Sequence, residues 1–172
     1  IILVETNAIE DMSELFSRVG SLKSVIFEWD TSNVKNINCM FSDCGNLTNI
    51  KCNKPWNTSK VCDMSHLFQY CNTLKELPNI SIWDMSKVVS IYGMFESCNS
   101  ITSIPDLSSW RVDNLKDIRS LFCRCGFLTR SPNLFRFNSS LKNIDNLFYG
   151  CSSLLYCLKK HLTKVGPCLS RT

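Results

Sequence analysis

The stretch that decides the fold runs from Trp83 to Leu107 and reads W-D-M-S-K-V-V-S-I-Y-G-M-F-E-S-C-N-S-I-T-S-I-P-D-L. Within it, four apolar residues stand at i, i+3, i+4 and i+7: Ile91, Met94, Phe95 and Cys98. This spacing places four side chains on one face of a helix. Ser90 is a good N-cap residue, and Asn99 suits the left-handed position that ends many helices. The stretch therefore predicts a capped short helix, followed by an extended segment at 101–104 that stops at Pro105.

The same pattern recurs along the chain. Tryptophans stand 27 residues apart, and Phe137 stands 27 residues beyond the last of them: Trp29, Trp56, Trp83 and Trp110. The apolar quartet occurs six times, and the other five are Met12, Leu15, Phe16, Val19; Ile37, Met40, Phe41, Cys44; Met64, Leu67, Phe68, Cys71; Ile118, Leu121, Phe122, Cys125; and Ile144, Leu147, Phe148, Cys151. A fixed period of 25 to 27 residues is typical of a solenoid, in which small units stack to share one core.

These elements together define the predicted fold. The residue before each quartet is polar and can accept a free backbone N–H: Asp11, Asn36, Asp63, Ser90, Asp117 and Asn143. The sequence therefore predicts an α/β repeat solenoid, with a parallel sheet on one side and short helices on the other. We expect about six units over residues 1–158 and a basic C-terminal tail at 159–172.

Composition limits the functional classes. The 172 residues are 44% hydrophobic and 20% charged, which is ordinary for a folded protein. A net charge of +4 is mildly basic and does not specify nucleic acid. No apolar run approaches the ~20 residues of a membrane-spanning helix, so we expect no span in this chain. The chain begins at Ile1 rather than methionine, which favours a fragment or a mature protein.

The eleven cysteines fall into two groups. Five close a quartet, and we expect them to be buried and reduced: Cys44, Cys71, Cys98, Cys125 and Cys151. Stacked helices lie about 8–10 Å apart, which is beyond easy reach of a disulfide. Paired strands lie only about 4.8 Å apart, so this mismatch should curve the solenoid with its strands on the inner side. The other six could be free or paired: Cys39, Cys52, Cys62, Cys123, Cys157 and Cys168.

Residues that could carry chemistry are scarce. His66, at an outward helix position, and His161, in the tail, have no partner at the spacing of a catalytic triad, so we expect them to be solvated. No cysteine pair has zinc-site spacing. The tryptophans stand at one repeat position, which favours a core stack over an aromatic binding platform. The sequence thus predicts no enzyme, no cofactor and no metal site.

The variable positions of the strand segments form the candidate binding surface. In segments such as L-K-S-V and L-T-N-I, the first and fourth residues should point inward and the middle pair outward. Repeated along the stack, such pairs make a flat polar ladder, which suits a protein or a glycan better than a small molecule. The candidate binding residues are Lys23, Asn49, Lys51, Glu76, Ser103 and Arg130. A second basic row, in the turns after the tryptophans, comprises Lys35, Lys60 and Lys87.

The consensus W-D-x-S-x-V-x-x-M-x-x-M-F-x-x-C-x-x-L-x-x-L-P-x-L resembles the BspA-like leucine-rich-repeat family of surface proteins over about residues 9 to 154. The resemblance implies a leucine-rich-repeat solenoid and a role in adhesion to host matrix proteins or to other cells. The 27-residue spacing exceeds the commonest one in that family, so an additional residue or two should lie in each return loop.

Two functions follow. The first is a non-enzymatic protein- or glycan-binding repeat module that forms part of a cell-surface adhesin, with its ligand on the host or on another cell. The alternative is an intracellular protein-interaction scaffold, because a reduced cysteine core suits the cytoplasm. Neither function involves nucleic acid. The expected location is the cell surface or the secreted fraction, with the cytoplasm as the alternative.

Overall fold

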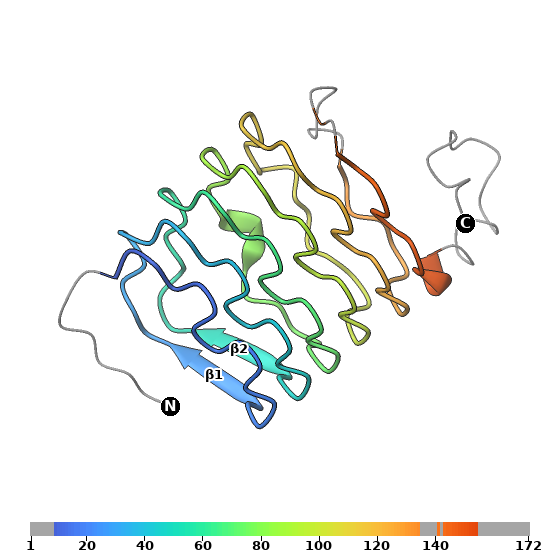
Figure 1. Cartoon of the computed structure of the whole chain (residues 1–172), viewed down its shortest axis with the longest axis horizontal. Coiled ribbons are helices and arrows are strands. Elements are labelled where there is room, and N and C mark those ends of the chain that lie inside the picture. Colours follow the sequence, from blue (N-terminus) through green and yellow to red (C-terminus); the bar gives the residue numbers. More distant parts are fainter. Residues whose placement is uncertain (1–8, 135–140, 142, 155–172) are drawn as a thin grey trace.

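The computed structural model describes residues 9–134, 141 and 143–154, and each repeat unit in it forms one coil of a solenoid (Figure 1). Six coils lie side by side in chain order, because one residue of each pairs in parallel with its counterpart in the next coil. These residues are Asp11, Asn36, Asp63, Ser90, Asp117 and Asn143, and we number coils one to six from them. Phe137 and the predicted basic tail lie outside the described residues.

Turns, rather than the predicted helices, carry the apolar quartets. In coil four, the Ile91 N–H donates to the Asp117 carbonyl of coil five at 3.0 Å, and the Gly93 N–H donates to the Arg119 carbonyl at 2.9 Å. The next N–H along the chain, that of Met94, donates to the Ile91 carbonyl within its own coil. Backbone N–H groups thus alternate between the next coil and the residue three positions back. An α-helix needs bonds four positions back, so the helix prediction is wrong.

We call these segments the turn ladder: residues 11–18, 36–43, 63–70, 90–97, 117–124 and 143–150. Four backbone hydrogen bonds join each pair of neighbouring segments. Two residues of every segment are left-handed, with φ between 53° and 75°: Glu14, Arg18, Cys39, Asp43, His66, Tyr70, Gly93, Ser97, Ser120, Arg124, Asn146 and Gly150. A positive φ at the third residue of a turn is the mark of type II geometry. The chain closes two such turns in succession in each coil.

The residues expected to be helix caps do accept backbone N–H groups, but within turns. Asp11 Oδ1 accepts the Ser13 N–H at 2.8 Å, and Asp63 Oδ1 accepts the Ser65 N–H at the same distance. Side chains of Asp and Asn that bond a backbone N–H two residues ahead stabilise a turn. The chemistry inferred from the sequence is therefore present, although the helix is not.

The strand side is regular only at its beginning. Strand β1, Ser24–Phe27, pairs in parallel with β2, Asn49–Cys52. A single bridge from Asn49 to Glu76 continues the sheet to coil three. A 3-10 helix, η1, follows at Ile80–Ile82. The predicted parallel sheet is confirmed between coils one and two, and in the described part of the chain it has two strands.

Prolines explain why the sheet stops. By the register of Asn49 with Glu76, Pro78 stands where coil two has Lys51. Pro105 and Pro132 follow at 27-residue intervals in coils four and five. A proline has no N–H to donate to a neighbouring strand. Coils three to five therefore pass each other in extended form without a continuous ladder.

The core is a series of stacks that run along the solenoid axis. Phenylalanine rings of consecutive coils stack with centroids 5.2 to 5.9 Å apart: Phe16, Phe41, Phe68, Phe95, Phe122 and Phe148. Trp56 stacks on Trp83 at 5.4 Å, and Trp110 is fully buried. Trp29 is half-buried against Phe16 and Phe27. The prediction of a tryptophan core stack is confirmed for Trp56 and Trp83.

The five quartet cysteines are buried and free, as expected. Each donates its S–H to the carbonyl of the quartet phenylalanine in the preceding coil, as Cys98 does to Phe68 at 3.0 Å. Burial raises the pKa of Cys44 and of Cys151 to about 11. The predicted spacing of 8–10 Å between the quartet segments of neighbouring coils is wrong, however, because hydrogen-bonded turns stack at the strand-like spacing of about 4.8 Å. Equal spacing on both sides also removes the predicted cause of curvature.

Candidate functional site

The predicted binding residues lie on the strand side of the solenoid. We call Ser24, Asn49, Glu76, Ser103 and Arg130 the outer row. Asn49 is the register partner of Ser24 and bridges to Glu76. Ser103 and Arg130 are brought together by the Thr129 N–H, which donates to the Thr102 carbonyl at 3.0 Å. Strand pairing therefore aligns Ser24, Asn49 and Glu76, and this bond aligns Ser103 with Arg130. The 27-residue period assigns Ser103 to the same position in the coil after Glu76.

Exposure separates the members of the outer row. Glu76, Ser103 and Arg130 are exposed, whereas Asn49 is half-buried. The Asn49 Nδ2 donates to Thr48 Oγ1 at 3.4 Å, and its Oδ1 is buried without a partner. A partner could therefore contact the Glu76, Ser103 and Arg130 side chains more readily than Asn49.

The two predicted lysines flank the outer row. Lys51 is exposed and pairs with Ile26 of β1, two residues beyond Asn49. Lys23 is exposed just before β1, and its carbonyl accepts the Thr48 N–H at 2.9 Å. The expected inward positions Val25 and Ile50 are buried. The fourth residues of the later strand segments, Leu77, Ile104 and Ser131, are less buried, because the chain turns at the proline that follows each of them.

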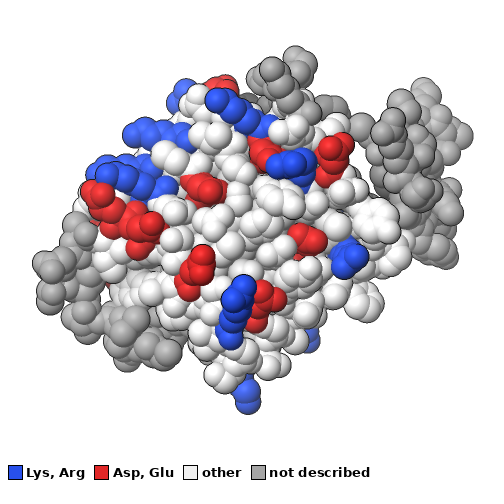
Figure 2. All heavy atoms as spheres, in the orientation of Figure 1, with Lys and Arg blue, Asp and Glu red and all other residues white. Residues whose placement is uncertain are grey.

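Charge on the visible face is mixed rather than concentrated. Figure 2 shows basic and acidic side chains in small groups, separated by wide areas without charge. Such a surface lacks the single-sign field that steers nucleic acids. It suits a partner that is recognised by shape and by individual hydrogen bonds.

The second basic row is not a single row. The Cys62 N–H donates to the Lys35 carbonyl, so Lys35 aligns with Cys62 rather than with Lys60. Lys60 donates to Asn33 Oδ1 at 2.7 Å, and Lys35 forms an ion pair with Glu10 at 2.8 Å. These lysines are therefore engaged with neighbouring polar groups.

The expectation of a solvated His66 is wrong. Its side chain is half-buried on the turn ladder, and its ring meets Tyr92 edge-on at 4.5 Å between centroids. The Nδ1 is buried without a hydrogen-bond partner, and burial lowers the pKa of the imidazole. Arg119 lies 5.0 Å from the Tyr92 ring centroid and forms an ion pair with Asp117 at 2.6 Å. No nucleophile in the described residues is hydrogen-bonded to this imidazole.

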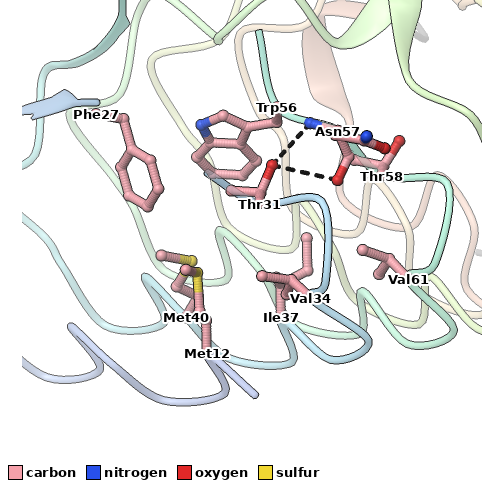
Figure 3. Close-up of a pocket in the computed structure, with 10 residues that line it drawn as sticks. All are labelled: Met12, Phe27, Thr31, Val34, Ile37, Met40, Trp56, Asn57, Thr58 and Val61. Atoms are coloured by element: carbon pink, nitrogen blue, oxygen red, sulfur yellow. Dashed lines mark hydrogen bonds between the residues drawn. The ribbon is translucent and has the colours of Figure 1, made fainter. Parts of the chain in front are cut away.

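A small void inside coils one and two does not qualify as a site. Figure 3 shows it between the Met12 and Met40 side chains and Trp56, with the Thr31 hydroxyl bonded to the backbone of Asn57. Its volume is about 10 Å³, at the lower limit for one water molecule. It is a packing gap in the apolar core.

Sequence reasoning missed a larger cleft between coils two and three. It has a volume of about 370 Å³, within the range of ligand-binding clefts. Its lining comes from the ends of both strand segments: Ile50, Cys52, Asn53, Pro55, Trp56, Leu77, Pro78, Asn79, Ile82 and Trp83. The available signal was the first proline of the 27-residue series, Pro78, which ends the pairing on this side.

Across the described residues, no group of three or more His, Cys, Asp or Glu side chains could hold a metal ion. The same residues include no helix that is long and apolar enough to cross a membrane.

Solved structures define the class of protein. The T. pallidum leucine rich repeat protein TpLRR is similar with a TM-score of 0.51 at 21% identity, over 88% of this chain and 74% of that chain. A leucine rich cell surface protein from Faecalibacterium prausnitzii A2-165 has a TM-score of 0.48 at 18% identity, over 88% of this chain and 44% of that chain. A leucine-rich repeat protein from Bacteroides ovatus has a TM-score of 0.45 at 23% identity, over 78% and 31%. The similarity to TpLRR shows a fold of the leucine-rich-repeat type.

The family is narrower than the class. The family described as Mycoplasma protein of unknown function, DUF285, matches residues 2–77 and 46–161. The chain belongs to this family, because these matches extend over most of its length. No curated protein matches the sequence.

Proposed function

We propose that this chain is a non-enzymatic protein- or glycan-binding module of a cell-surface adhesin, and that the outer row is its recognition surface. The observation that carries the proposal is the alignment of exposed Glu76, Ser103 and Arg130 along consecutive coils. On the turn ladder, backbone hydrogen bonds join neighbouring coils. On the strand side, these three side chains are exposed and available to a partner. The resemblance of the repeat to BspA-like surface proteins supports the surface location.

Binding should be spread over several coils, because no single coil offers concentrated charge. Arg130 is the best anchor, since a planar guanidinium makes paired hydrogen bonds to carboxylate or sulfate groups. Each other member of the outer row should contribute modestly.

The test replaces Asn49, Glu76, Ser103 and Arg130 together with alanine. Immobilised fibronectin, collagen and heparin serve as probes of matrix proteins and of a sulfated glycan, with binding measured by surface plasmon resonance. We expect the parent to bind at least one surface, and the quadruple variant to bind it at least tenfold more weakly at an unchanged thermal unfolding midpoint. The matched control replaces Lys35, Lys60 and Lys87 with alanine. Loss of binding in the control but not in the quadruple variant would reject the outer row.

The second candidate is an intracellular protein-interaction scaffold. The buried free thiols favour it, because unpaired cysteines are typical of reducing compartments. The two candidates differ in accessibility. Protease added to intact cells of the source organism should cleave the chain if it is displayed at the surface, and should leave it whole if it is a scaffold inside the cell.

A further inference from the structure

Backbone pairing between coils two and three ends early. The Lys75 N–H donates to the Thr48 carbonyl at 3.2 Å, and the bridge between Asn49 and Glu76 is the last backbone pairing of the two strand segments. No backbone hydrogen bond links residues 77–82 to Ile50–Asn53, all of which the structure describes. Pro78 supplies no N–H, and η1 then shortens the path of the chain. The edge of β2 that faces coil three therefore stays unpaired beyond Asn49.

An unpaired strand edge is a template for another extended chain. The edge of β1 is covered by β2, but at β2 the next coil moves away and leaves the 370 Å³ cleft. The cleft exposes polar and apolar atoms in about equal measure, and its apolar part includes Pro55, Pro78 and two tryptophans. At the rim, the Ile82 side chain is 54% exposed. The cleft thus combines polar groups with exposed apolar side chains.

A buried donor at the cleft lacks an acceptor. Trp56 is 6% exposed, and its Nε1 has no hydrogen-bond partner. Figure 3 shows this nitrogen on the side of the ring turned away from Thr31 and Asn57. The equivalent indole of coil four is satisfied, because Trp110 Nε1 donates to the Ile80 carbonyl at 2.8 Å. Trp110 therefore shows how an indole at this repeat position can be satisfied, and Trp56 lacks the corresponding hydrogen bond.

Cys52 lies in the same part of the cleft as the Trp56 indole. Burial raises the pKa of the Cys52 thiol, and the neighbouring indole N–H of Trp56 opposes that rise. The thiol therefore lies beside the unpaired indole nitrogen. Cys52 also lines the cleft and is half-buried, so a molecule in the cleft would cover it.

We propose that the cleft between coils two and three binds an extended segment of a partner polypeptide. The segment adds to the free edge of β2 through its backbone, and it places an apolar side chain between Leu77, Pro78 and Ile82. Strand addition obtains affinity from main-chain hydrogen bonds and specificity from side-chain pockets, and both features are present here. The proposal rests on the proposed function only in that the partner is a protein.

The test measures alkylation of Cys52 by iodoacetamide in the folded, full-length chain. The chain is then digested, and mass spectrometry of the resulting peptides gives the extent of labelling at each cysteine. The probe is the capped peptide Ac-Ser-Val-Leu-Val-Ser-amide, whose branched residues favour an extended backbone. The matched probe Ac-Ser-Val-Leu-Pro-Ser-amide keeps the central leucine and loses one N–H. We expect the first peptide at saturation to slow Cys52 alkylation at least tenfold, and the second to slow it less than twofold. Cys62, which is exposed and outside the cleft, should react at the same rate throughout.

Two surface variants complete the design. Ile82→Glu places a charge at the rim and should abolish the protection. Ile26→Glu changes a residue of similar exposure, 51%, on β1 outside the cleft and should leave protection intact. Equal protection by both peptides, or protection of Cys62 as strong as that of Cys52, would overturn the proposal. So would the absence of protection by the first peptide. None of these results bears on the outer row, whose variants are tested against fibronectin, collagen and heparin.

Discussion

The turn ladder and the strand side are built from the same repeat, but their coils are joined differently. On the turn ladder, four backbone hydrogen bonds join every neighbouring pair of coils from one to six. On the strand side, the regular sheet ends after β1 and β2. One side therefore maintains the stack, while the other side leaves backbone groups and side chains available. The difference suggests where a binding surface can vary without loss of the fold.

Residue types follow this division. The turn ladder keeps its quartet and its polar turn residue in all six coils, because packing and hydrogen bonds depend on them. The outer row changes from Ser24 through Glu76 to Arg130, since its members pack against little. Stability should therefore respond strongly to changes on the first side and weakly to changes on the second.

The largest expected effect comes from Phe95→Ala. Phe95 is fully buried and stacks between Phe68 and Phe122 at 5.7 and 5.6 Å. Its removal leaves a cavity in the shared core, which costs about 3–5 kcal/mol in the free energy of unfolding. Urea denaturation followed by circular dichroism measures the loss. Phe127→Ala is the matched control, because that side chain is 63% exposed and should change stability by about 0.5 kcal/mol or less. A loss below about 1 kcal/mol for Phe95→Ala would show that the stack contributes little.

The next effect concerns the crowding of neighbouring turns. Gly93 has φ of 58°, and a Cβ there would lie 2.7 Å from His66 Nδ1. Ser120 takes the same conformation in the following coil, so the left-handed backbone alone does not require glycine. We expect Gly93→Ala to cost about 1–3 kcal/mol, from backbone strain and displacement of the His66 ring.

A double-mutant cycle separates the two causes. If His66 is the obstacle, His66→Ala should recover part of the loss in the Gly93→Ala background, giving a coupling energy of about 0.5–3 kcal/mol. Gly45→Ala is the matched glycine control, because nothing lies within 4 Å of a Cβ at that position. Strict additivity of the two changes would mean that the cost is backbone strain alone.

The quartet spacing shows what the sequence could and could not predict. Spacing of i, i+3, i+4 and i+7 identified four fully buried side chains of coil four: Ile91, Met94, Phe95 and Cys98. The same spacing fits two successive four-residue turns, because each turn also returns its first and last residues to one side. Only the destination of the backbone N–H groups distinguishes the two, and a partner in the next coil leaves no periodic signal of its own.

The positive φ values were hidden for a related reason. Glycine would have revealed them, but of the twelve left-handed residues in the turn ladder only Gly93 and Gly150 are glycines. The hydrogen bonds to the next coil hold residues such as Tyr70 and Arg124 in this conformation against their local preference. Tertiary pairing therefore overrides local propensity here.

The outer row was predictable and the cleft was not. Exposure of Glu76 and Arg130 follows from the prediction that the middle pair of each strand segment points outward, which is a local property. The cleft depends on the hydrogen bonds that coil three fails to make with β2. That failure involves residues 27 positions apart, such as Lys51 and Pro78, and becomes visible only once their register is known.

An alkaline titration tests the buried thiols of the turn ladder. Burial raises the pKa of Cys98 well above its ordinary value. Above about pH 8.5 the unfolded chain releases this proton while the folded chain retains it, so stability falls as pH rises. The contribution of one thiol approaches about 1.4 kcal/mol per pH unit. Cys98→Val, which introduces the residue of coil one at this position, should reduce the slope between pH 9 and 10 by up to that amount. Equal slopes would mean that the Cys98 thiol is accessible to solvent in the folded chain.

The smallest expected effect sharpens the comparison most directly, because it changes the strand side toward the regularity of the turn ladder. Pro78 is buried, so Pro78→Ala adds an N–H that can face the free edge of β2 without burying a charge; Lys51 carries this N–H at the equivalent position of coil two. One additional hydrogen bond contributes about 0.5–1.5 kcal/mol, and the greater freedom of the unfolded chain without proline offsets about 0.4–1 kcal/mol. The net change in stability should therefore be below about 1 kcal/mol, and hydrogen exchange is the better measurement. The amide at position 78 should become protected, and the peptide Ac-Ser-Val-Leu-Val-Ser-amide should shield Cys52 less, because the edge that it would use is now paired. Pro105→Ala, in coil four, is the matched control and should leave Cys52 unaffected. Rapid exchange at position 78 would assign the end of the sheet to η1 rather than to proline.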